Sequence, residues 1–130
     1  MRCKASIRII GEFDPKEMPK KLSTMGSYTY LKGQKALLGH LIKDNVWIMN
    51  SPLEKTARLE KHLKWVEKVC KTYREGIQKI GRTAKVDVFC SVTAVGDEGF
   101  SIPAKLMTIL GELGLKIEVS LVFLSSKEKT

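Results

Sequence analysis

The sequence predicts an α+β domain in which a four-stranded mixed or antiparallel sheet carries its helices on one face. Three observations favour it: four stretches with strand-like apolar patterns, helical spacing between them, and a length of 130 residues, which suits one domain. With 43% hydrophobic and 28% charged residues, the chain can build a core without disulfides or a structural metal. The single domain 1–130 is expected to comprise a strand–helix–strand unit (1–52), a long helix (53–81), a second strand–helix–strand unit (84–124) and a tail (125–130).

The first unit opens with alternating apolar and polar residues over 3–9, a pattern typical of a half-buried strand. Residues 14–17, Asp-Pro-Lys-Glu, place a capping carboxylate, a proline and a glutamate where a short helix begins. The pattern then fades, so 27–44 is expected to be a long loop with a short strand near 28–31. The apolar run 46–49 predicts a second strand with both faces partly covered.

A capping box of Ser51 and Glu54 predicts the start of the longest helix, which Gly81 ends. Apolar residues follow in steps of four and three, as one face of a continuous helix requires. They are Leu59, Leu63, Val66, Cys70, Tyr73, Ile77 and Ile80. Lysines at 61, 64, 68 and 71 follow the same spacing on the opposite side. The sequence therefore predicts an amphipathic helix with a lysine-rich outer face.

The second unit repeats the alternation over 85–92 and again over 117–123, which predicts the third and fourth strands. Between them, Ser101 is expected to cap a helix that Gly114 ends. Since both ends of the chain run strand, helix, strand, we expect a ferredoxin-like arrangement with one long central helix inserted between its halves.

Several segments together resemble domain-of-unknown-function family 4279 over nearly the whole chain. They are ASIRIIGEFDPKEMPKKL at 5–22, YLKGQ at 30–34, VWIMNS at 46–51, LEKTARLEKHL at 53–63, VDVFCSV at 86–92 and GELGLKIEVSLVF at 111–123. Asn45 departs from the G-x-W-x-x-S part of the family pattern, where a glycine is expected before Val46 and Trp47. The resemblance implies a small bacterial-type cytoplasmic α+β protein of unassigned activity, with no catalytic residues to carry over. Some such small families are immunity proteins that bind and neutralise a toxin, which is an analogy at the level of the family.

The formal net charge of +9 is unevenly distributed. Residues 1–35 carry eight basic and three acidic side chains, 54–85 carry ten and four, and 86–130 carry four and six. A basic surface of this kind favours acidic partners, whether an acidic protein face, nucleic acid or anionic lipid, although many basic domains bind none of these specifically.

The sequence favours a cytoplasmic protein that does not enter a membrane. The N-terminus lacks the apolar run of a signal peptide, and no segment holds the 18 consecutive apolar residues of a membrane span. Cys3, Cys70 and Cys90 lie far apart in apolar patterns, which is typical of reduced core thiols rather than disulfides.

No catalytic, metal or cofactor site is predicted. There is no CxxC pair, and His40 and His62 lack a ligand partner at i+3 or i+4. Neither GxxxxGK[ST] nor GxGxxG is present, and neither histidine lies in a recognisable Ser-His-Asp or Cys-His signature.

One arrangement of carboxylates is left open by the sequence. Asp97 or Glu98 could meet Glu12 or Asp14 if the loops that carry them lie at the same end of the sheet. Such a pair of carboxylates would be the starting point for the hypothesis that this chain is an enzyme.

Two groups of residues are the binding candidates. Lys61, Lys64, Lys68 and Lys71 suit a phosphate backbone or an acidic protein groove, although any solvated helix face shows the same pattern. Tyr28, Tyr30 and Lys32, in the 27–44 loop, suit a peptide or small-ligand site, or form a lid over the sheet.

The leading hypothesis is a non-enzymatic partner-binding protein whose lysine face and 27–44 loop meet an acidic protein, such as a toxin. The alternative is a nucleic-acid-associated basic domain, although the low aromatic content of 7% and the lack of an RRM signature speak against sequence-specific single-strand binding. A third hypothesis is a small-molecule sensor or an enzyme, which requires a concave apolar pocket with convergent polar groups. The sequence leaves the oligomeric state open.

Overall fold

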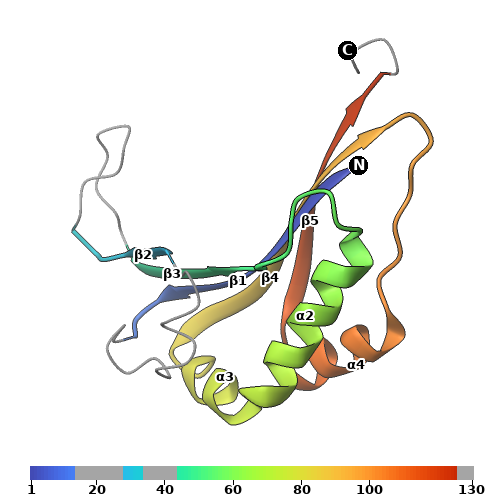
Figure 1. The fold of residues 1–130 in the computed structure, drawn as a ribbon. Helices are drawn as coiled ribbons and strands as arrows, with labels where there is room; N and C mark the ends of the chain where they lie inside the picture. Colours follow the sequence, from blue (N-terminus) through green and yellow to red (C-terminus); the bar gives the residue numbers. More distant parts are fainter. Residues whose placement is uncertain (14–27, 34–43, 126–130) are drawn as a thin grey trace.

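The computed structural model describes residues 1–13, 28–33 and 44–125, which form one mixed sheet with helices on one side of it (Figure 1). The strands are β1 (Arg2–Gly11), β2 (Tyr28–Tyr30), β3 (Asn45–Asn50), β4 (Ala84–Val95) and β5 (Lys116–Leu124). The helices are α2 (Leu59–Thr72), α3 (Arg74–Ile80) and α4 (Ala104–Leu113). The α+β class is confirmed.

The sheet has the order β2-β3-β1-β4-β5. β1 is antiparallel to both β3 and β4, whereas β4 and β5 are adjacent and parallel, joined by a crossover through α4. The four expected strands are confirmed, and the three-residue β2, which pairs with β3, adds a short edge strand where one was expected near 28–31. The ferredoxin-like label is not confirmed, because the first unit pairs its strands antiparallel and the second pairs them parallel.

The core lies between the sheet and α2. Alternate residues of β1 point toward the helices and are almost fully buried, from Cys3 at 3% exposed to Ala5 at 0%. β4 contributes Val88 and Cys90 to the same layer, because its register places them opposite Ile7 and Ala5. α2 covers this face with the apolar side that its three- and four-residue spacing predicts, and that side includes six buried residues. The buried residues of α2 are Leu59, His62, Leu63, Val66, Val69 and Cys70.

One long central helix over 53–81 is not confirmed, because the chain divides into α2 and α3. The break is at Tyr73, whose backbone angles, φ −112° and ψ 28°, leave the helical region. The apolar spacing nevertheless continues through the break and places Ile77 in the core. A continuous spacing therefore fixes which side is buried, but it does not require a continuous helix.

The helical segment also begins later than the capping box predicts. The amide of Ser51 donates to the carbonyl of Ala5, and the amide of Cys3 donates to the carbonyl of Lys55, both at 2.8 Å. These bonds hold the segment after β3 alongside the start of β1, and the helix begins only at Leu59. Ser51 is therefore not the helix cap that its position suggested.

α4 matches its prediction at one end only. Gly114 ends it in the left-handed conformation at φ 69°, which glycine adopts without steric cost. The residue before the first turn is Pro103, not Ser101, and it makes no side-chain cap. The amide of Ser101 donates instead to Oε1 of Glu60 on α2 at 2.9 Å, which ties the loop before α4 to the neighbouring helix.

The helix expected to open at residues 14–17 lies outside the described residues, as do most of the 27–44 loop and the end of the tail. In the part that is described, no helix has both the length and the apolar character needed to cross a membrane.

Candidate functional site

The outer side of α2 carries the lysines that the sequence singles out. Lys61, Lys64, Lys68 and Lys71 are all exposed and lie along this one helix. Their positions follow from the helical repeat, because the residues that alternate with them turn inward to the core. The structure therefore brings the four lysines together, as expected.

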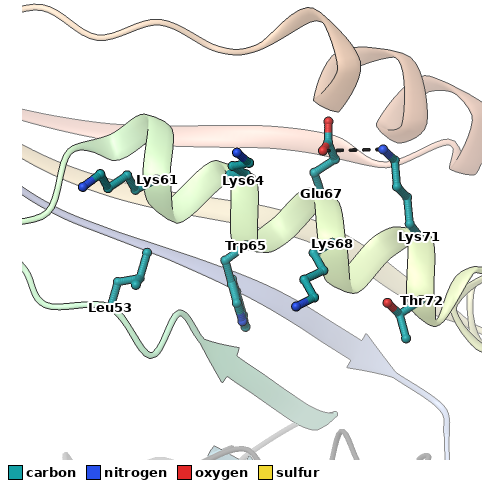
Figure 2. A pocket seen from close by; sticks show the side chains of 8 residues that line it. All are labelled: Leu53, Lys61, Lys64, Trp65, Glu67, Lys68, Lys71 and Thr72. Atoms are coloured by element: carbon teal, nitrogen blue, oxygen red, sulfur yellow. Dashed lines mark ion pairs between the residues drawn. The ribbon is translucent and has the colours of Figure 1, made fainter.

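A groove of about 680 Å³ lies along this face of α2 (Figure 2). Its walls include the stems of the lysines, the indole of Trp65 and, from the segment after β3, the side chain of Leu53. Trp65 is half-buried, and Leu53 is 36% exposed. The groove thus combines an apolar floor with a rim of positive charge.

Trp65 is the residue in this groove with an unmet hydrogen-bonding group. Its Nε1 atom is buried and has no acceptor in the described part of the chain. A buried N–H without an acceptor costs about 1–3 kcal/mol, so most such groups in proteins find a partner. Figure 2 shows the indole projecting away from the helix axis on the same side as Lys68.

The lysines differ in how their charges are balanced. Nζ of Lys71 lies 3.5 Å from Oε2 of Glu67, an i,i+4 pair drawn in Figure 2 on the side of α2 away from Trp65. Lys61, Lys64 and Lys68 make no ion pair with any described residue. Three lysines without an ion pair in the described chain therefore line the groove together with the indole, and of these Lys68 projects on the same side of α2 as Trp65 (Figure 2).

The other predicted candidates lie elsewhere. Tyr28 and Tyr30 belong to β2, at the edge of the sheet beyond β3 and away from α2 (Figure 1). Lys32 is exposed just after β2, and its amide donates to Oδ1 of Asn45 at 2.8 Å. Asn45 in turn donates to the carbonyl of Phe13, so this departure from the family pattern ties two segments together. The described structure does not join these residues to the lysine face.

Trp65 is not among the candidate site residues that the sequence singled out. The available signal was its spacing, since Trp65 is four residues after Lys61 and three before Lys68, which puts all three on neighbouring surface. No signal pointed to Leu53, because the sequence placed it inside the long helix.

His62 and Ser51 form a hydrogen-bonded pair in the core. Nδ1 of His62 is 2.8 Å from Oγ of Ser51, and Nε2 is 3.1 Å from the carbonyl of Glu54. The carbonyl can only accept, so Nε2 carries the proton and Ser51 donates to Nδ1. Burial lowers the pKa of His62, which favours this neutral form. With the two residues 0% and 2% exposed, the pair is built into the interior and does not face the groove.

The sheet face away from the helices holds a charged cluster. Arg8 binds Asp87 through two hydrogen bonds of 2.8 and 2.7 Å and reaches Glu118 at 3.0 Å. Its guanidinium lies 4.5 Å from the centre of the Phe89 ring, a cation–π contact. The bonds to Asp87 raise the pKa of Arg8 further above its ordinary value, so the arginine stays charged. This cluster holds β1, β4 and β5 together.

The carboxylates left open by the sequence do not all meet. Glu98 binds the terminal ammonium of Met1 at 3.0 Å, at the start of β1, whereas Glu12 follows Gly11 at its other end. A strand of this length separates the two by roughly 30 Å. Asp14 lies outside the described residues.

The cysteines are free and buried. Burial raises the pKa of the Cys70 thiol to about 11 and that of Cys90 to about 12, so both stay protonated near neutral pH. Among the residues described, no three His, Cys, Asp or Glu side chains are placed to share a metal ion.

The fold and the groove define a small α+β domain with a lysine-rimmed groove on one helix. A family model described as "Domain of unknown function (DUF4279)" matches residues 1–124, so the chain belongs to this family. The resemblance carried by the sequence segments is confirmed. Comparison with curated proteins and with solved structures gives no match.

Proposed function

We propose that this protein is a non-enzymatic binding protein that recognises an acidic segment of a partner protein in the groove on α2. One observation carries the proposal: three exposed lysines without an ion pair in the described chain line a groove whose apolar wall includes the half-buried indole of Trp65. A segment with carboxylates would pair with the lysines, and an apolar side chain on the same segment would cover the apolar floor.

The spacing of the lysines favours a helical partner segment. Lys61, Lys64 and Lys68 are three and four residues apart, so they span roughly 10 Å along α2. Carboxylates at the same spacing on an amphipathic helix match that distance. An apolar residue between them would pack against Trp65 and Leu53, where aromatic anchors contribute most to affinity.

Two further features support a protein that is not an enzyme and that acts in the cytoplasm. Ser51 and His62 bond to each other in the core and are not directed at the groove, which favours binding over nucleophilic catalysis. The three buried free thiols favour action in the reducing cytoplasm. An acidic toxin is one partner with the required chemistry.

The test is titration with a synthetic amphipathic helix that carries glutamates at i, i+3 and i+7 and leucines between them. The same peptide with lysines in place of the glutamates is the peptide control. We expect the acidic peptide to bind, to change the emission of Trp65, and to bind more weakly as salt screens the charges.

The double variant Lys64→Glu/Lys68→Glu is expected to weaken binding by about tenfold or more, since each tenfold is only about 1.4 kcal/mol. The matched control is Lys79→Glu/Lys105→Glu, which makes the same change in net charge at exposed positions on α3 and α4. Equal loss in both variants, or no binding of the acidic peptide at millimolar concentration, contradicts the proposal.

A duplex and a single-stranded oligonucleotide complete the experiment. Preferential binding of either one, with an affinity that falls steeply with salt, would replace the acidic protein by nucleic acid as the partner.

A further inference from the structure

The free edge of the sheet at β5 is explained neither by the core nor by the groove. β5 is the last strand in the sheet order, so its outer main-chain groups have no neighbouring strand among the described residues. Figure 1 shows its carboxyl-terminal half extending past α2 and α4. An open edge of this kind can accept another strand through main-chain hydrogen bonds.

The side chains on this edge are apolar and exposed. Leu121 is 45% exposed, Val122 50% and Phe123 63%. The register places Leu121 and Phe123 on the helix side of the sheet, opposite Val92 and Ala94, while Val122 is on the other side. Both sides of the same stretch are therefore apolar and open to solvent.

This edge lacks the usual protection against pairing. Natural edge strands carry lysines, prolines or bulges that discourage another chain from adding to them. Residues 119–124, Val-Ser-Leu-Val-Phe-Leu, contain no charged residue and no proline. An unprotected edge of this composition indicates that a strand covers it in the functional state.

The charge distribution favours a second copy of this chain as that strand. Residues 86–130 carry four basic and six acidic side chains, a net charge of −2, although the whole chain carries +9. β5 itself carries one basic and one acidic side chain, Lys116 and Glu118, so a second copy meets no net charge at this edge. A two-fold axis would use the same apolar edge twice.

We propose that β5 pairs antiparallel with β5 of a second copy about a two-fold axis at Ser120. Ser120 is the middle residue of this nine-residue strand, so this register pairs every residue of it. Ile117 then faces Phe123 of the second copy, and Val119 faces its Leu121. Lys116 and Glu118 face Leu124 and Val122, so no like charges are opposed. The dimer forms one continuous sheet across both copies.

The proposed register can be tested by disulfide cross-linking. In Ser120→Cys, the two new thiols lie directly opposite each other, where Cβ atoms are about 4.5–5.5 Å apart, near disulfide distance. The native thiols Cys3, Cys70 and Cys90 are buried and do not compete. We expect mild oxidation to give a disulfide-linked dimer of S120C.

Lys116→Cys is the matched control, since it is also an exposed position on β5. In the proposed register its two copies are eight positions apart, roughly 27 Å, so they do not cross-link. Cross-linking of K116C to the same extent as S120C would overturn the register.

Sedimentation of the unmodified chain from micromolar to millimolar concentration tests the dimer itself. We expect a monomer–dimer equilibrium that Phe123→Lys and Val122→Lys abolish, because each adds a charge to the edge. Met107→Lys, at a position on α4 that is 54% exposed, is expected to leave it unchanged. Circular dichroism checks that each variant is folded.

A chain that stays monomeric up to millimolar concentration overturns the proposal, as does an assembly that Met107→Lys disrupts and Phe123→Lys does not. The dependence on salt distinguishes pairing at β5 from binding of the acidic peptide in the groove on α2. The apolar edge is expected to pair as well or better at high salt, which screens the repulsion between two basic chains, whereas an acidic peptide binds more weakly. Either proposal can therefore fail alone.

Discussion

Two parts of the molecule place basic side chains beside an aromatic ring. In one part acidic side chains balance the positive charge, and in the other they do not. On the sheet face away from the helices, Arg8 lies over Phe89 and is bound by Asp87 and Glu118. On the outside of α2, three lysines line one groove with Trp65 and make no ion pair among the described residues. A charge balanced within the chain stabilises the fold, whereas an unbalanced one is available to a partner.

The largest expected effect is the loss of Asp87. This carboxylate is 1% exposed and is bound twice by Arg8, so its removal leaves a partly buried arginine without its main partner. Breaking such a pair typically costs 3–5 kcal/mol, and we expect Asp87→Ala to lower the free energy of unfolding by about 3 kcal/mol. Urea unfolding measures it.

Glu118→Ala is the control within the same cluster. Its side chain is 53% exposed, and its bond to Arg8 is a surface contact. Exposed pairs contribute about 0–1 kcal/mol. Equal losses from the two variants would mean that burial does not determine the strength of this cluster.

A smaller effect is expected at His62, on the inner side of the helix that carries the lysines. Its pKa is lowered in the folded state, chiefly by burial, so the unfolded chain binds more protons below about pH 6.5. Stability should therefore be intact above that pH and fall as the pH decreases, by at most about 1.4 kcal/mol per pH unit.

Urea midpoints between about pH 7.5 and 5.5 measure this dependence before most carboxylates titrate. His62→Gln provides the comparison, because it removes the titrating group. If the variant keeps the same pH dependence in this range, another group is responsible.

The smallest effect on stability is expected on the outer side of α2. Lys64 and Lys68 are exposed and unpaired in the described chain, so Lys64→Glu/Lys68→Glu should change the free energy of unfolding by no more than about 0.5 kcal/mol per site. The same variant is expected to bind the acidic peptide more weakly. A large loss of stability in urea would instead give these lysines a role in the fold.

Local patterns predicted the fold class and much of the sheet. Alternation located β1, β4 and β5, and the lysine spacing located the outer face of α2. These predictions succeeded because burial on one side imposes a period of two or of 3.6 residues on a chain. Such a period can be recognised without information about contacts between residues that are far apart in the sequence.

The features that the sequence missed depend on distant contacts. The helix does not begin at Ser51 because the main chain there bonds to β1, and Ser51 itself bonds to His62. The parallel pairing of β4 and β5 likewise depends on the crossover, which alternation does not reveal. Leu53 reaches the groove for the same reason, since its segment is not helical.

The pairing of β1 with β4 has a consequence for the newly made chain. The ion pair between Arg8 and Asp87 joins residues 79 positions apart. In chain order, β1 is the first strand and β4 is the next to last, although they are neighbours in the sheet. At about 5–20 residues per second, a ribosome takes roughly 4–16 s to supply Asp87 after Arg8. During that time β1 has no β4 to pair with, and the charges of Arg2, Lys4 and Arg8 along one side of it oppose association with other nascent chains.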